Sequence, residues 1–204
     1  MGDLCVAIAC ESDDHDAVVY RRLLELLLGR PIERWRDERT FRFYGHKHTL
    51  KLLKPYLADA MSDGVQHALI ALDNDGGSKK NPEHTVAHHS EEQAAQEVGC
   101  RFCKAVESVP RLWTAGGNLT AVGVPVQALE TWLLCVRQYE FGTATPERQY
   151  DRRHLKRALY GSPLPPAAER ASLGVELLGR DDAVAVLRSR LSFRLLESQL
   201  AAWR

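Results

Sequence analysis

The sequence predicts an α/β fold, in which helices flank a mostly parallel sheet and a helical extension follows at the C-terminal end. Apolar runs of strand length alternate with helix-permissive segments over the first two thirds of the chain. After Tyr139 this alternation gives way to basic and proline-rich stretches. We therefore expect an α/β domain over residues 1–140 and a helical extension over residues 141–204 that packs on it.

The expected strands are short apolar runs. Residues 3–10 (DLCVAIAC) are almost continuously apolar, and residues 65–72 (VQHALIAL) have the same character. Residues 119–124 form a further strand that ends before a proline, and residues 32–35 are a shorter candidate. Continuous rather than alternating apolarity indicates parallel strands that are buried on both faces.

Helices are expected between these strands. Residues 17–28 carry leucines at helical spacing and stop at Gly29. Residues 49–61 also have a helical pattern, with Pro55 either dividing the helix or opening its second half. Residues 36–48 show no clear period and are expected to be irregular. Further helices are expected at 83–98, at 127–137, where the pattern is amphipathic, and in two or three pieces after the proline-rich segment 162–166.

The composition restricts the classes of protein that fit. The chain has 204 residues, with 27 Lys and Arg against 27 Asp and Glu, and 45% of the residues are hydrophobic. This argues against a disordered chain and against a general basic surface for binding nucleic acid. No apolar run approaches the length of a membrane span, so we expect no membrane partner. Five cysteines, an odd number, make a disulfide framework improbable and favour the reducing cytoplasm.

Carboxylates follow two of the expected strands at the point where each strand ends. Glu11 comes directly after the first strand, and Asp73 and Asp75 follow the 65–72 run. Ligands of parallel α/β sheets collect beyond the carboxyl ends of the strands. Converging carboxylates repel one another, and a hard divalent cation such as Mg²⁺ or Mn²⁺ is the usual way to neutralise them. The alternative is that each acid caps a helix or a turn, which we also expect of Asp13 and Asp14, although Asp14 could supplement the site.

These residues resemble the Toprim fold of topoisomerases, primases and related nucleases. The resemblance rests on a strand ending in Glu11, on the later Asp73-Asn74-Asp75, and on the segment VPVQALETWLL at 124–134. That segment is similar to the P-x-x-E-x-W-L-L element of small stand-alone Toprim-like proteins, which are often placed with defence-related genes. Ser12 stands where a glycine commonly follows the first Glu.

The resemblance implies an activity and roles for its residues. Glu11 would act as a metal ligand or general base, Asp73 and Asp75 would hold Mg²⁺ or Mn²⁺, and Glu130 would lie on the second-metal side. Two cations suit phosphoryl transfer, so the expected function is a metal-dependent nuclease that hydrolyses phosphodiester bonds in DNA or RNA, with a place in anti-phage defence. For Glu130 the alternative is a solvated residue beside core positions.

A second metal site is suggested by histidines and cysteines. His84 and His88 lie one helical turn apart, and Cys100 and Cys103 follow at a spacing that suits tetrahedral zinc. His89 competes with His88 as the second ligand. Such a site would be structural, since four protein ligands leave no open position. Ordinary thiols and exposed histidines are the alternative.

Basic and aromatic residues supply candidate nucleic-acid contacts. Lys79 and Lys80 follow the acidic motif and could contact phosphates. A denser basic group lies at 148–157, where a solvated helix face is the alternative to a binding patch. Aromatic residues at 39–51 suit either base stacking or packing in a core. The basic residues proposed to bind nucleic acid in the 148–157 group are Arg148, Arg152, Arg153 and Lys156.

Two other functions compete with the nuclease. Asp73-x-Asp75-Gly76 also resembles the nucleophile motif of haloacid-dehalogenase phosphatases, although these enzymes carry it on the first strand and need a late acidic pair, for which only Asp181 and Asp182 are available. The other competitor is a non-enzymatic subunit of a complex whose ATPase is a separate protein, because this chain contains no Gly-rich Walker loop.

Overall fold

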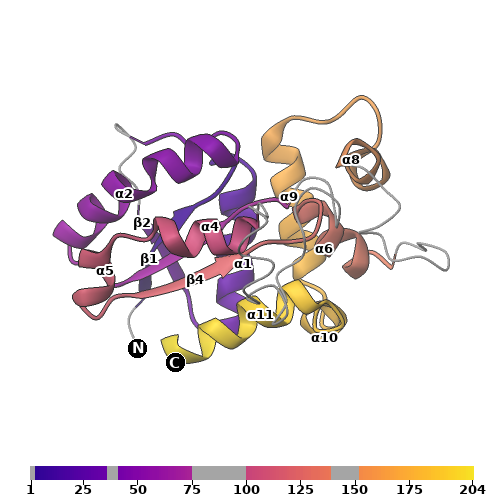
Figure 1. Cartoon of the computed structure of the whole chain (residues 1–204). Coiled ribbons are helices and arrows are strands. Elements are labelled where there is room, and N and C mark those ends of the chain that lie inside the picture. The colour runs from indigo at the N-terminus through magenta and orange to yellow at the C-terminus, as the bar shows by residue number, and fades with distance from the viewer. Residues whose placement is uncertain (1–2, 36–40, 75–99, 139–151) are drawn as a thin grey trace, which may run out of the picture.

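The computed structural model describes residues 3–35, 41–74, 100–138 and 152–204. Its centre is a sheet of four strands: β1 (Leu4–Ala9), β2 (Ile32–Trp35), β3 (His67–Ala71) and β4 (Leu119–Gly123). The strand order is β2-β1-β3-β4, and every neighbouring pair is parallel. The expected α/β fold is therefore confirmed (Figure 1).

The strand register explains the continuous apolar runs. Ile8 pairs with Leu69, and Leu69 pairs with Ala121, so these three side chains lie on one face of the sheet and join one hydrophobic cluster. Ala9 and Ile70 form the next pair along the strands and belong to a second cluster on the other face. Both faces are covered, as parallel strands require.

Helices from different parts of the chain cover the two faces. On one face α1 (Asp16–Leu28), α6 (Leu129–Val136) and α11 (Leu191–Leu200) contribute to the first cluster. On the other face lie α2 (His46–Ser62), α4 (Arg101–Ser108) and α5 (Arg111–Ala115), whose Trp113 is fully buried (Figure 1). Each layer is thus built from segments that are far apart in the sequence.

Several helices differ from their sequence-based expectations. Helix α2 begins at His46 and continues through Pro55, which lies on its exposed side. The carbonyl left without its usual N–H donor can be solvated there, so the helix is neither divided nor ended. The amphipathic pattern expected at 127–137 is wrong, because every residue of α6 is buried. Helices α4 and α5 were not expected.

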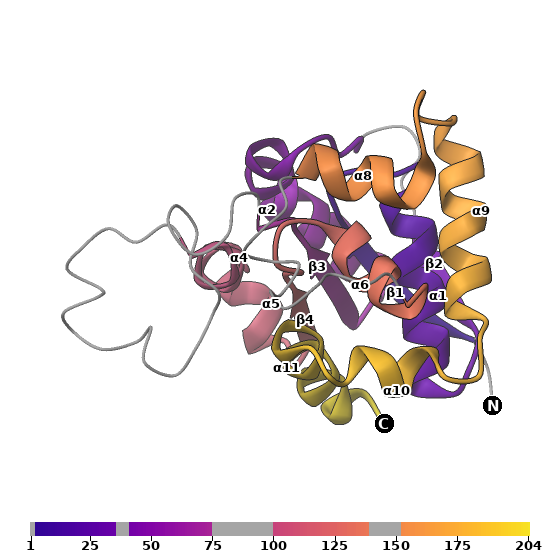
Figure 2. The same ribbon diagram turned by 90° about the vertical axis from the view of Figure 1, so that its right-hand side faces the viewer.

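The extension after residue 152 belongs to the same hydrophobic core. It consists of α8 (Arg152–Tyr160), α9 (Ala167–Leu178), α10 (Ala183–Leu187), α11 and a final 3₁₀ turn, η3 (Ala201–Trp203). Phe193 packs edge-on against Trp132 of α6 at 5.4 Å between ring centroids. Figure 2 shows α8 and α9 beside α6 and α1. The helical C-terminal extension that the sequence predicts is thus present.

The outer edge of β4 is closed by a side chain of this extension. The Gln199 amide of α11 accepts a hydrogen bond from the Val122 N–H at 3.0 Å and donates one to the Val122 carbonyl at 3.0 Å. The amide therefore takes the place of a neighbouring strand and covers an edge that would otherwise be open to pairing.

No helix in the described ranges combines the length and apolarity that crossing a membrane requires. All five cysteines lie within these ranges, and all of them are free thiols.

The contact between α1 and α9 allows a test of the packing. A Cβ atom at Gly174 of α9 would lie 2.6 Å from Cγ2 of the buried Val19. Because a β-branched side chain has little freedom to move away, we expect Gly174→Ala to lower the free energy of unfolding by about 1–3 kcal/mol in urea denaturation. The exposed Ser172→Ala on the same helix is the control, with a change within about 0.5 kcal/mol. A Gly174→Ala protein as stable as the wild type would contradict this packing.

Candidate functional site

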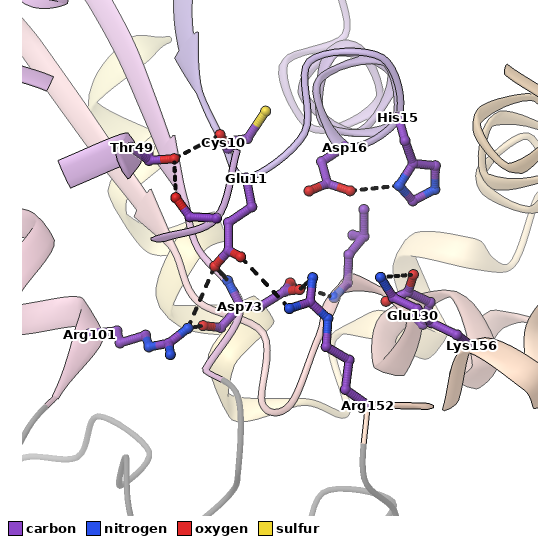
Figure 3. A network of polar contacts seen from close by, with 12 residues as sticks. Cys10, Glu11, His15, Asp16, Thr49, Asp73, Arg101, Glu130, Arg152 and Lys156 are labelled. Carbon is purple, nitrogen blue, oxygen red and sulfur yellow. Dashed lines mark hydrogen bonds and ion pairs between the residues drawn. The ribbon is translucent and has the colours of Figure 1, made fainter. Parts of the chain in front are cut away.

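Glu11 and Asp73 lie side by side where the two central strands end. Each follows its strand by two residues, and β1 and β3 are neighbours in the sheet. Glu11 Oε1 accepts a hydrogen bond from the backbone N–H of Asp73 at 3.0 Å, and both side chains are buried (Figure 3). The structure thus brings together two of the residues that the sequence predicts for the site.

The segment that carries Asp73 is fixed by backbone hydrogen bonds to the last residue of β4 and to the segment after it. The Leu72 N–H donates to the Gly123 carbonyl at 3.0 Å, and the Asn74 N–H donates to the Pro125 carbonyl at 3.1 Å. The pairing of β3 and β4 therefore extends past the strands themselves. As a result, Asp73 faces the start of α6.

The Asp73 carboxylate links a helix N-terminus to an arginine. Its Oδ1 accepts a hydrogen bond from the Leu129 N–H at 3.0 Å, at the first turn of α6. Its Oδ2 lies 3.0 Å from Nη2 of Arg152, the first residue of α8. A carboxylate in this position interacts favourably with the unpaired N–H groups at the helix end as well as with the guanidinium.

Two arginines flank the carboxylate pair on different sides. Arg101, at the start of α4, donates a hydrogen bond to the Asp73 carbonyl, and its Nη1 lies 3.5 Å from Glu11 Oε1. Nη1 of Arg152 lies 3.9 Å from Glu11 Oε2. The Arg101 side chain is only 7% exposed, whereas that of Arg152 is 37% exposed. Arg101 is therefore an internal partner of the acids, and Arg152 is open to solvent.

Glu130 belongs to the same cluster. It lies in the first turn of α6 and is only 2% exposed, so the alternative of a solvated Glu130 is wrong. Its Oε1 lies 3.7 Å from Nζ of Lys156 on α8 (Figure 3). The burial follows from α6 being covered on every side, which leaves this helix no solvent-facing position for a carboxylate.

A fourth acid, Asp16, was not predicted. It opens α1, is buried, and its Oδ1 lies 2.6 Å from His15 Nδ1, while Tyr160 contacts the other ring nitrogen of His15 at 2.9 Å. The signal in the sequence was its place at the start of the helix that follows Glu11. Arg101 was also missed, because residues 100–103 were interpreted as part of a zinc site.

The crowding of acids perturbs Asp73. Burial raises the pKa of the Asp73 carboxyl well above its ordinary value, and the neighbouring charges of Asp16, Glu130 and Glu11 raise it further. Arg152 acts in the opposite direction. A carboxyl whose pKa is raised both by burial and by like charges is characteristic of functional sites.

The basic group on α8 is divided between two roles. Arg152 and Lys156 lie one helical turn apart and contact the buried acids, whereas Arg153 and Arg157 are exposed. Arg152 and Lys156 thus share one face of α8. The interpretation of that face as merely solvated is wrong for these two residues.

The acids of this cluster have the ligand chemistry that Mg²⁺ and Mn²⁺ prefer, since all their donors are carboxylate oxygens. The positions of these acids, however, do not match a cation site among the described residues. In the described part of the chain no group of three or more Asp, Glu, His or Cys side chains is arranged to hold a metal ion. Glu11 and Asp73 instead pair with arginines. A divalent cation therefore requires Arg152 to move and a further ligand to join.

Several predicted site residues cannot be placed against this cluster. They lie outside the described residues, and the expectations about metal and phosphate contacts that depend on them stay predictions. They are Asp75, Lys79, Lys80, His84, His88, His89 and Arg148.

The two cysteines of the expected zinc site are neighbours. Cys100 is buried immediately before α4, and Cys103 is half-buried in the first turn of that helix. Burial and the adjacent Cys100 thiol raise the pKa of Cys103 to about 11. A thiol whose pKa is raised by an adjacent thiol is the arrangement that a bound cation relieves, because the metal ligand is the thiolate.

Comparisons with known protein families, curated proteins and solved structures found no match. The resemblance to Toprim proteins therefore stays a prediction from sequence motifs. The functional interpretation rests on the residues of this chain.

The zinc site can be tested by metal analysis. Protein purified without a chelator is expected to hold about one zinc per chain, and Cys103→Ser is expected to lose most of it, since a hydroxyl is a poor zinc ligand. The half-buried Cys5→Ser on β1 is the matched control and should keep its zinc. A fully folded wild-type protein without zinc would contradict the site.

Proposed function

We propose that this chain is a metal-dependent nuclease that hydrolyses phosphodiester bonds in DNA or RNA. The observation that carries the proposal is the convergence of four buried acids, Glu11, Asp16, Asp73 and Glu130, with two arginines and a lysine at the carboxyl end of a parallel sheet. Burying so many charges together is costly for a purely structural purpose. It is common at sites that handle charged substrates.

The cations of the cluster suit a phosphate substrate. A guanidinium forms paired hydrogen bonds with phosphate oxygens as readily as with a carboxylate. Arg152 is the more exposed of the two arginines, so it can exchange Asp73 for a substrate phosphate. Arg101 stays buried and holds Glu11 and the Asp73 backbone in place. Arg152 is thus proposed to bind substrate, and Arg101 to position the acids.

The acids supply the proton chemistry and the proposed cation site. Glu11 and Asp73, together with Asp75, would hold Mg²⁺ or Mn²⁺, and the bound ion would polarise the phosphate and acidify the attacking water. Glu11, which receives an N–H hydrogen bond from Asp73, has a fixed orientation from which it can accept a proton. The release of Arg152 from Asp73 when a phosphate binds would free a carboxylate oxygen.

The competing functions have less support from the described residues. The phosphatase alternative needs a late acidic pair at the site, but before α10 Asp181 is exposed and Asp182 pairs with Arg180. A non-enzymatic subunit of an ATPase-containing complex needs no clustered acids. A role in anti-phage defence is implied by the Toprim resemblance alone, and we include it in the proposal on that basis. An ATPase partner belongs to the competing interaction subunit.

The proposal predicts a defined pattern of cleavage. Labelled DNA and RNA, each single- and double-stranded, should be cut only when Mg²⁺ or Mn²⁺ is added. Glu11→Gln and Asp73→Asn should each lower the rate at least about 100-fold, because each removes a carboxylate from the reacting centre. Gel analysis of the products measures the rate, and Asp182→Asn, at a side chain that is 44% exposed and pairs with Arg180, is the control that keeps it.

Other outcomes of the same assay would decide against the nuclease. Cleavage that survives both substitutions would remove the proposed site. Release of phosphate from small esters that depends on Asp73 but not on Glu11 would favour the phosphatase. If the wild type shows neither activity but binds a partner protein, the chain would be an interaction subunit.

A further inference from the structure

A cavity of about 530 Å³ opens beside the carboxylate cluster. Its lining includes Glu11 and Ser12 from the end of β1 and, from the segment before α2, Arg42 and Tyr44. This volume is within the range of pockets that bind small molecules or single nucleotides. Nothing in the proposed hydrolysis uses the wall of the cavity that faces Glu11.

The aromatic residues of that wall fall into two groups. The rings of Phe41 and Phe43 pack on Tyr56 at 5.5 and 4.9 Å between centroids and join the core. Tyr44, in contrast, is 67% exposed and stacks on His48 at 3.8 Å, with 16° between the ring planes. The sequence left stacking and core packing as alternatives for this segment. The structure assigns Phe41 and Phe43 to the core and leaves Tyr44 as an exposed aromatic ring.

The exposed ring is held at a fixed place relative to Glu11. Tyr44 forms an isolated antiparallel bridge with Ser12, and the Gly45 N–H donates to the Glu11 carbonyl at 3.1 Å. The Phe43 N–H donates to Asp13 Oδ2 at 2.9 Å. These contacts fix the aromatic segment to the residues that follow β1. A ligand stacked on Tyr44 would therefore be positioned next to the cluster without a rearrangement of the backbone.

The charges that line the cavity favour stacking over binding of a phosphate alone. Arg34 is paired with Asp13, and Asp14 and Glu11 add negative charge. Arg42 is exposed and has no ion-pair partner among the described residues. One available guanidinium beside an aromatic ring suits a nucleotide whose base stacks while its phosphate contacts the arginine.

We infer that this cavity receives an unpaired base of a single-stranded nucleic acid, with the base stacked on Tyr44 and the adjacent phosphate at Arg42. In a duplex each base is covered by its stacked neighbours and cannot enter a concave site without being extruded. The inference rests on the proposed nuclease function and specifies its substrate as single-stranded. The phosphodiester on the other side of the bound nucleotide is then the one presented to Glu11 and Arg152.

Fluorescence anisotropy without added divalent cation tests the inference separately from cleavage. Labelled single-stranded oligonucleotides of DNA and of RNA are compared with the duplexes of the same sequences. We expect tighter binding of the single strand, about tenfold weaker binding by Tyr44→Ala, and near wild-type binding by Tyr44→Phe and Tyr44→Trp, which keep an aromatic face. Leu112→Ala removes another exposed apolar side chain, from α5, and is the control that binds like the wild type.

Arg42→Ala completes the test through the salt dependence. Removing a phosphate contact should weaken binding of every sequence alike. It should also lower the slope of log Kd against log salt by the amount that about one phosphate contact contributes. Equal affinity for single strand and duplex, or unchanged binding by Tyr44→Ala, would overturn the inference even if the protein cleaves nucleic acid. Single-strand binding that depends on Tyr44, in a protein that never cleaves, would support the binding site and contradict the nuclease.

Discussion

The buried pair of carboxylates, Glu11 and Asp73, is the constraint on which the arrangement of the site depends. A carboxylate removed from water needs hydrogen-bond donors or opposite charges. Here the donors come from four elements besides β1: the segment after β3, the first residues of α4 and α8, and the N-terminus of α6. The requirement to satisfy two acids therefore brings together segments that are far apart in the sequence, as Figure 3 shows.

The sheet determines where those acids meet. In a parallel sheet the carboxyl ends of neighbouring strands lie on the same edge, and Glu11 and Asp73 each follow their strand by two residues. Networks of buried charges contribute little net stability compared with apolar packing of the same volume. A cluster that is weak as a source of stability and rich in ionisable groups is best explained by its chemistry. The neutral net charge of the chain gives no sign that acids and bases gather in this one cluster.

The sequence predicts the parts of this structure that depend on local pattern. Apolar runs identified the strands, and the position of Glu11 and Asp73 after those runs identified the centre of the site. The pattern could not reveal that Arg101 and Arg152 neutralise these acids, because pairing between distant residues leaves no periodic signal. The pattern also wrongly predicted an amphipathic helix for α6. All residues of this helix are buried, and the burial of its Glu130 depends on tertiary packing that a sequence pattern does not show.

The claim that the acidic cluster serves catalysis rather than stability is tested most directly by the free energy of unfolding of Asp73→Asn. It is measured in urea at neutral pH, on the same preparation that is used for cleavage. The raised pKa of Asp73 means that the folded state binds its proton more tightly than the unfolded state does, so the protonated acid stabilises the fold at low pH. That stabilisation is lost as the pH rises through the raised pKa, and above that pKa the buried carboxylate costs stability relative to a neutral side chain. We therefore expect Asp73→Asn to be at least as stable as the wild type while its cleavage is lost. A variant that is clearly less stable, and whose folded fraction cleaves at the wild-type rate, would contradict the account.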